Sequence, residues 1–129
     1  MRNYEQEFEK RTAFIRQLMK ETGASGIVFG NSGGKDSALT GILCKAACDN
    51  TVGLIMPCGS RRNFQEDLED AETLARQFGI QTRVVDLTGL KEQALATLGQ
   101  ITTLTDMAAA NLAPRLRMMT LYAVAASEN

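Results

Sequence analysis

The fold of this chain is decided by one glycine-rich stretch, Gly30-Asn31-Ser32-Gly33-Gly34-Lys35-Asp36-Ser37. The uncharged residues 26–29 precede it, and we expect them to form a strand of a parallel sheet, buried on both faces. A helix is predicted from near Ser37, because apolar residues recur after it at three- and four-residue spacing. A strand, a glycine turn and a helix start aim backbone N–H groups at one point, where the helix dipole adds positive charge. The stretch therefore predicts a site for an anion such as phosphate.

The side chains of this stretch indicate a metal as well. Gly33 and Gly34 lack Cβ, so the chain can take positive φ here and let a pyrophosphate approach the backbone closely. Ser32 and Ser37 can donate hydroxyl hydrogen bonds. The Asp36 carboxylate would repel a phosphate unless a divalent cation such as Mg²⁺ bridges the two. Asp36 is therefore a candidate metal ligand.

Two common nucleotide signatures do not fit these letters. In a Walker loop counted from Gly30, the second glycine would fall on Lys35, and Asp36 stands where lysine is required. No register of the glycines supplies the dinucleotide pattern Gly-x-Gly-x-x-Gly. A plain connecting turn is an alternative, but such a turn has no need of this combination of serine, glycine and aspartate. The pattern Ser-Gly-Gly-x-Asp-Ser instead resembles the pyrophosphatase loop of the ATP-pyrophosphatase (PP-loop) superfamily, which releases pyrophosphate while adenylating a substrate.

Composition limits the class of protein. A chain of 129 residues supports one domain. Fourteen basic residues against 15 acidic ones, without a run of one sign, favour a small-molecule partner over a nucleic acid or a membrane surface. No histidine is present, which excludes imidazole chemistry. Since there is neither an apolar signal core nor a run of membrane-spanning length, we expect a cytoplasmic protein.

The three cysteines are an odd number and lack the spacing of a metal site. We expect Cys44, Cys48 and Cys58 to be small core residues, in preference to a disulfide or zinc site.

Helix and strand signals alternate along the rest of the chain. We expect helices over residues 3–21, 63–78, 88–98 and 111–125, strands over 51–56 and 80–87, and a connector with some strand character over 100–105. Gly23 and Gly79 are predicted helix stops, Asn63 and Asn111 predicted helix caps, and Arg61 and Arg62 solvated loop residues in preference to an anion-steering pair. The first helix either covers the sheet or forms a dimer contact, with equal weight. The alternation predicts an α/β open parallel sheet.

Ligands of such sheets bind at the carboxyl ends of the strands. That rule gathers Gly30, Met56-Pro57 and Asp86-Leu87 on one rim, where we expect the adenosine of ATP, with Met56 among its contacts.

A second motif stands near the end of the chain, Asn111-Leu112-Ala113-Pro114-Arg115-Leu116-Arg117-Met118-Met119-Thr120-Leu121-Tyr122. Pro114 is tolerable in a first helical turn, whose N–H groups lack intrahelical partners. Arg115 and Arg117, two residues apart, point to different sides of a helix, so one would face a ligand or partner and the other a carboxylate or solvent. On its own such a pair is usually structural. In combination with the glycine stretch, this motif resembles the ammonia-dependent NAD⁺ synthetases.

This resemblance covers nearly the whole chain and implies a Rossmann-like sheet of the adenine nucleotide alpha hydrolase type, with helices on both faces. It implies a role in NAD biosynthesis: ATP adenylates the carboxylate of deamido-NAD⁺ with loss of pyrophosphate, and ammonia then displaces AMP. By similarity, ATP would contact Gly30, Asn31, Ser32, Gly33, Gly34, Asp36, Ser37 and Met56. Asp36 would be the catalytic residue and Mg²⁺ ligand, and Arg115 would contact deamido-NAD⁺ from the neighbouring subunit of a homodimer. Lys35 could contact a phosphate through its charge, and Arg117 is left as either a structural residue or one that supports the ligand contacts indirectly.

Members of this family are longer, and their next strand would begin just after Asn129. We therefore expect a single, incomplete ATP-pyrophosphatase-type domain over residues 1–129, truncated after three strands. Two alternatives to the synthetase stay open. One is an inactive nucleotide-binding or dimerisation fragment. The other is a different PP-loop adenylating enzyme, although GMP synthetase, asparagine synthetase and the tRNA lysidine synthetases share the loop without the arginine helix.

Overall fold

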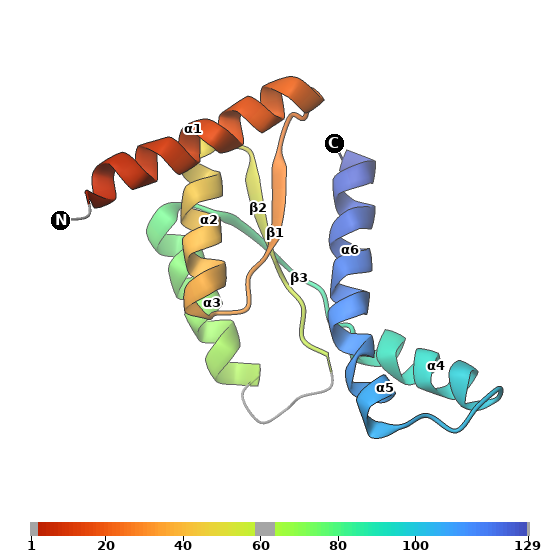
Figure 1. The fold of residues 1–129 in the computed structure, drawn as a ribbon. Coiled ribbons are helices and arrows are strands. Elements are labelled where there is room, and N and C mark those ends of the chain that lie inside the picture. The colour runs from red at the N-terminus through yellow and green to blue at the C-terminus, as the bar shows by residue number, and fades with distance from the viewer. Residues whose placement is uncertain (1–2, 59–63, 129) are drawn as a thin grey trace.

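The computed structural model describes residues 3–58 and 64–128, with the side chains of residues 64–67 left out. The elements, in chain order, are α1 (Tyr4–Thr22), β1 (Ile27–Gly30), α2 (Lys35–Ala47), β2 (Thr51–Ile55), α3 (Phe64–Phe78), β3 (Gln81–Val84), α4 (Thr88–Gly99), α5 (Asp106–Ala110) and α6 (Leu112–Glu128) (Figure 1). The expectations for Arg61, Arg62 and Asn63 lie outside the described residues.

The described sheet has three parallel strands in the order β1-β2-β3. Val28 of β1 is paired with Val52 of β2, and Leu54 of β2 with Arg83 of β3. Helices α2 and α3 make the two crossovers and pack on one face, and α6 packs against β1 on the other (Figure 1). The expected Rossmann-like α/β architecture with helices on both faces is confirmed.

Helix α1 packs against α2 and not on the sheet. Asn3 caps its first turn by accepting a hydrogen bond from the Gln6 N–H, and Gly23 ends it at a φ of 72°, as predicted. The main contact of α1 among the described elements is thus α2, so the contacts do not support the interpretation of α1 as a cover for the sheet. The dimer contact stays a prediction. Much of its apolar surface is exposed, including Tyr4 and Leu18.

The core alternates between the faces of the sheet because successive strand residues point to opposite sides. On the α3 side, Phe29 packs with Ala75 and Ile80. On the α6 side, fully buried Leu54 forms a cluster with other buried apolar residues, Met56, Cys58 and Leu87. Only Phe29 of β1 is buried, whereas Ile27 and Val28 are half-buried, so the expectation of a strand buried on both faces is wrong in part. β1 lies at an edge of the described sheet, where fewer neighbours cover it.

Several element boundaries differ from the predictions. β3 ends at Val84 instead of Leu87, although the N–H groups of Val85 and Leu87 still donate to the Ile55 and Pro57 carbonyls. Residues 100–105 form no strand. They lead into the unpredicted helix α5, where the Thr105 hydroxyl accepts from the Ala108 N–H. Asn111 ends α5 and does not cap α6 through its side chain, as far as the described contacts extend.

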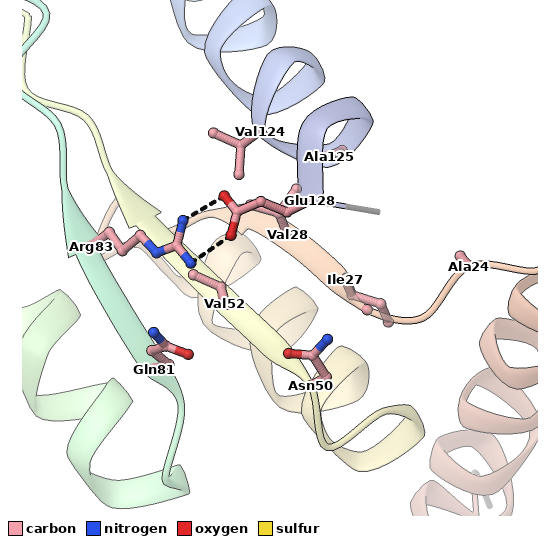
Figure 2. A pocket seen from close by; sticks show the side chains of 11 residues that line it. Ala24, Ile27, Val28, Asn50, Val52, Gln81, Arg83, Val124, Ala125 and Glu128 are labelled. Carbon is pink, nitrogen blue, oxygen red and sulfur yellow. Dashed lines mark hydrogen bonds and ion pairs between the residues drawn. The ribbon is translucent and has the colours of Figure 1, made fainter.

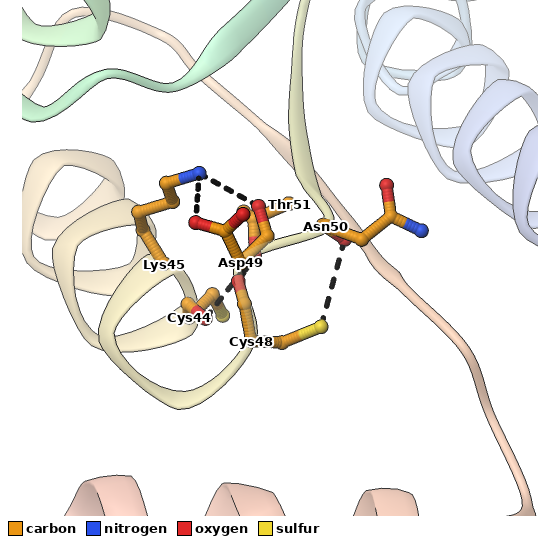
Figure 3. Close-up of polar contacts among 6 residues, drawn as sticks. All are labelled: Cys44, Lys45, Cys48, Asp49, Asn50 and Thr51. Atoms are coloured by element: carbon orange, nitrogen blue, oxygen red, sulfur yellow. Dashed lines mark hydrogen bonds and ion pairs between the residues drawn. The ribbon is translucent and has the colours of Figure 1, made fainter.

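A buried threonine joins α2 to β2 (Figure 3). The Thr51 hydroxyl lies 2.6 Å from the Cys48 carbonyl oxygen and 3.1 Å from that of Cys44, at the last turn of α2. Lys45 pairs with the Asp49 carboxylate at 3.0 Å. Cys44 and Cys58 are buried, as expected, and Cys48 is half-buried. Burial raises the pKa of the Cys44 thiol, and the nearby Cys48 raises it further, so the thiol stays protonated.

An ion pair links β3 to the end of α6 (Figure 2). The Arg83 guanidinium makes two hydrogen bonds to the Glu128 carboxylate, of 2.6 and 2.8 Å. They lower the pKa of the Glu128 carboxyl. The pair stands over a cavity of about 210 Å³ whose walls include Val28, Val52 and Val124.

Gly41 provides a first test of the packing. A Cβ at this position of α2 would lie 2.6 Å from Cζ of buried Phe29. We expect Gly41→Ala to lower the free energy of unfolding, because overpacking costs about 1–3 kcal/mol while the gain in helix propensity is about 1 kcal/mol. Gly89→Ala in α4 is the matched control, since nothing lies within 4 Å of its added Cβ. Urea titration measures both variants. Equal or higher stability of Gly41→Ala would contradict the packing described here.

Glu128 provides a pH test. A carboxyl whose pKa falls on folding adds stability above its unfolded-state pKa, and that stability is lost as the pH falls through the folded-state pKa. We expect Glu128→Gln to unfold more easily than the natural chain at pH 7, with the difference disappearing in acid. Glu92→Gln, on the exposed surface of α4, is the control. Thermal melts over a pH series measure the gap, and a gap that does not change with pH would be the contrary result.

Candidate functional site

The residues 30–37, named here the glycine loop, join β1 to α2 at the carboxyl ends of the strands. Asn31 anchors this loop from inside the protein, where only 2% of the residue is exposed. Its side-chain amide donates to the Ala71 carbonyl of α3 at 3.1 Å, and its Oδ1 accepts from the Gly33 N–H. Its backbone N–H donates to the Leu54 carbonyl of β2 at 2.8 Å. The start of the loop is thus fixed to both β2 and α3.

Two serines close the glycine loop on itself. The hydroxyls of Ser32 and Ser37 lie 3.0 Å apart. The Ser37 hydroxyl donates to the Gly34 carbonyl and accepts from the Ser32 N–H, and the Ser32 hydroxyl accepts from the Gly34 N–H. The hydroxyls of Ser32 and Ser37 therefore make their described hydrogen bonds within the loop. A phosphate oxygen would take the place of a hydroxyl as acceptor for these N–H groups.

The two central glycines differ in conformation. Gly33 has a φ of 83°, the left-handed region that favours glycine, as predicted. Gly34 has a φ of −83° and is the N-cap of α2, so it does not use the positive φ that glycine allows. The helix starts at Lys35, two residues earlier than predicted, and an N-cap residue takes extended backbone with negative φ.

The amino end of α2 carries the free donors of the site. The first N–H groups of a helix, here those of Lys35, Asp36 and Ser37, have no partner within the helix. Gly34 has no side chain that could cap them. Together with the helix dipole, these donors favour a negatively charged ligand. The exposed side chains of Lys35 and Asp36 begin the helix there.

A cavity of about 440 Å³ opens beside the glycine loop. The loop side of its wall is Gly30, Asn31 and Ser32. The remaining lining residues come from the end of β2, from α3 and from α6: Leu54, Ile55, Met56, Pro57, Cys58, Leu68, Arg117 and Leu121. A Cβ on Gly30 would lie only 3.3 Å from Cε of Met56, so glycine leaves room for the Met56 side chain in the cavity wall. An apolar wall facing a polar loop suits a nucleotide, with an aromatic base and charged phosphates.

The structure brings together only part of the predicted site. Gly30, Asn31, Ser32 and Met56 line the cavity, and Gly33, Gly34, Lys35, Asp36 and Ser37 follow in the adjoining loop and helix start. Asp86, predicted on the same rim, does not line it. Its carboxylate accepts from the Thr88 N–H, which lowers its pKa.

The two arginines of α6 occupy different faces, as predicted. Arg115 is exposed and donates to the Asn111 carbonyl one turn back at 3.1 Å. Arg117 is half-buried, lines the cavity and donates from Nε to the Met56 carbonyl at 2.9 Å. The sequence left the role of Arg117 open between a structural residue and one that supports the ligand contacts indirectly. The spacing of the arginines shows that only one can face inward, but it does not say which.

The chemistry available for a metal rests on Asp36. Within residues 3–58 and 64–128, no cluster of three or more acidic or cysteine side chains forms a protein-only cage. Mg²⁺ commonly binds through one or two carboxylates with substrate phosphates as further ligands, and an exposed Asp36 at an anion site fits that arrangement.

No helix of the described chain is both long and apolar enough to cross a bilayer.

Comparison with known proteins places these features in a family. A family model described as NAD synthase matches residues 7–129. The NH(3)-dependent NAD(+) synthetase of Finegoldia magna is 41% identical over 121 residues, which cover 93% of this chain and 48% of the relative. That of Methanococcus aeolicus is 39% identical over 131 residues, which cover 98% and 50%. The chain thus spans about half the length of the curated relatives it matches.

Solved structures agree with this result. An NH3-dependent NAD synthetase from Campylobacter jejuni, in complex with the nitrate ion, has a TM-score of 0.88 at 30% identity, and the match covers 100% of this chain and 55% of that one. An NMN synthetase from Francisella tularensis also has a TM-score of 0.88, at 28% identity, over 98% of this chain and 52% of that one. From the family match over residues 7–129 and these relatives, the chain belongs to the NAD synthase family.

Proposed function

We propose that this chain binds ATP at the glycine loop and acts in the ATP-dependent amidation of deamido-NAD⁺ with ammonia. The observation that carries the proposal is the glycine loop beside the cavity of about 440 Å³, in a chain of the NAD synthase family. The base and ribose would occupy the cavity against Met56, and the phosphates would lie on the loop. A cytoplasmic reaction is expected, since it consumes ATP.

The reaction balances in two steps. A carboxylate oxygen of deamido-NAD⁺ attacks the α-phosphorus of ATP, and the bond from that phosphorus to pyrophosphate breaks. Ammonia then attacks the acyl carbon, loses a proton, and AMP leaves with the former carboxylate oxygen. The free N–H groups at the start of α2, together with Ser32 and Ser37, would hold the negative charge of the leaving pyrophosphate. Lys35, exposed at the same place, would add a positive charge.

Asp36 is the residue that would hold Mg²⁺ in this site. When bound, the ion would neutralise phosphate charge and so make pyrophosphate a better leaving group. Asp36 would otherwise place a negative charge beside the phosphates, at the helix end that attracts them.

A homodimer is part of the proposal, with Arg115 contacting the deamido-NAD⁺ of the partner. The exposed face of α6 supports it. Arg115 shares that face with the large apolar side chains Met118, Met119 and Tyr122, at three-, four- and seven-residue spacing. Apolar side chains grouped in this way on an exposed helix are typical of a protein interface.

Two alternatives have specific support. The similarity to an NMN synthetase makes nicotinate mononucleotide a second acceptor to consider. The second alternative is an inactive nucleotide-binding or dimerisation module, because the chain spans about half the length of its relatives.

An exchange assay separates these functions. The chain is incubated with ATP, Mg²⁺, radioactive pyrophosphate and one acceptor, either deamido-NAD⁺ or nicotinate mononucleotide. We expect label to enter ATP only with deamido-NAD⁺, because adenylation of the carboxylate is reversible. Exchange with nicotinate mononucleotide but not with deamido-NAD⁺ would show that the mononucleotide is the acceptor. ATP binding without exchange supports the module, and the absence of ATP binding would overturn the proposal.

The role of Asp36 predicts an effect that changes sign with the metal. With Mg²⁺ present, we expect Asp36→Asn to weaken ATP binding roughly tenfold or more, because a carboxylate ligand is lost. Without Mg²⁺, the same variant should bind ATP as well as or better than the natural chain, because a repulsive charge is gone. Titration calorimetry measures both conditions.

Asp106→Asn is the matched control, since Asp106 is likewise exposed in the first turn of a helix. It should alter neither affinity. Equal weakening of Asp36→Asn with and without Mg²⁺ would show that Asp36 is not the metal ligand.

A further inference from the structure

Arg117 is the one charged residue among the described residues that line the cavity beside the glycine loop. Its neighbours in the wall are polar and uncharged, such as Asn31 and Ser32, or apolar, such as Leu54 and Leu121. The positive charge of the cavity wall therefore comes from α6, across from the loop.

The position of this guanidinium is fixed. Nε of Arg117 donates to the Met56 carbonyl at 2.9 Å, which joins the middle of α6 to the end of β2. That bond uses one of the five N–H donors of a guanidinium, and it restrains the planar group at the cavity wall. The donors on the two Nη atoms have no described protein partner, and Arg117 is among the residues that line the cavity.

The charge of Arg117 lacks a counter-ion among the described side chains. The arginines in described ion pairs have carboxylate partners: Arg83 pairs with Glu128, and Arg11 with Glu7. A half-buried cation without a counter-ion is unfavourable, because it has lost water and gained no opposite charge. A ligand with negative charge would supply what is missing.

We propose that Arg117 contacts the negatively charged part of the nucleotide, so that the phosphates lie between the glycine loop and α6. This inference rests on the proposed function, and it assigns to Arg117 a ligand contact distinct from the one proposed for Arg115. The apolar wall holds the base, while Arg117 and the loop hold the charge from two sides.

The test compares ATP with adenosine, which has the same base and ribose without phosphates. Titration calorimetry with Mg²⁺ is done on the natural chain, Arg117→Gln, Arg117→Lys and Arg16→Gln. Arg16 is the matched control because its Nη2 also donates to a backbone carbonyl, that of Ala46, at 2.9 Å and away from the cavity. Arg16→Gln removes the same charge and the same kind of bond.

We expect Arg117→Gln to weaken ATP binding about 10- to 100-fold, as for the loss of a hydrogen bond to a charged group. Adenosine binding should change little, and Arg117→Lys should recover part of the ATP affinity because it keeps the charge. Arg16→Gln should leave both affinities unchanged. If thermal melts show that Arg117→Gln does not fold, Arg117→Met replaces it, since methionine keeps the apolar stem.

Two results would overturn the inference while leaving the proposed function in place. One is unchanged ATP affinity in the neutral variant. The other is an equal loss of ATP and adenosine affinity in the glutamine and lysine variants, which would make Arg117 only a tie between α6 and β2. If the natural chain binds neither compound, the proposed function fails first, and the inference fails with it.

Discussion

The site depends on one buried amide, the side chain of Asn31. A polar side chain with almost no exposure must have its hydrogen bonds made inside the protein. Asn31 makes them to the Ala71 carbonyl of α3 and to the Gly33 N–H, while its backbone continues the pairing of β1 with β2. Sheet, loop and helix are thereby held in one arrangement at the point where the chain leaves β1. The direction of α2 and the position of its free N–H groups follow from that arrangement.

Much of this fold could be predicted because its signals are local. A glycine after a helical stretch gives the stops at Gly23 and Gly79, both with positive φ in the structure. At Gly34, by contrast, glycine allows positive φ but the start of the helix does not use it. The short helix α5 also has a local signal, the cap residue Thr105 followed by Asp106 in the first turn.

The rest of the site could not be predicted, because it depends on contacts between residues far apart in sequence. Arg117 donates to the Met56 carbonyl, 61 positions away in the sequence, and the arginine motif alone does not predict that contact. The packing of α1 is similar: its apolar residues predict a contact with another element, and only the fold shows that this element is α2. Periodicity identifies a face of a helix, whereas the chain topology decides what that face touches.

The closed form of the glycine loop has a consequence for which anions it will accept. The Ser37 hydroxyl accepts from the Ser32 N–H and the Ser32 hydroxyl from the Gly34 N–H, so these two donors are already paired, whereas the first N–H groups of α2 are free. An ion that binds to the two paired donors must compete with the Ser32 and Ser37 hydroxyls. A weakly charged or singly bonding ion such as chloride gains little from that exchange. A chain of linked phosphates can replace several acceptors at once, and the loop therefore acts as a filter in favour of multidentate anions over the simple salts that surround it.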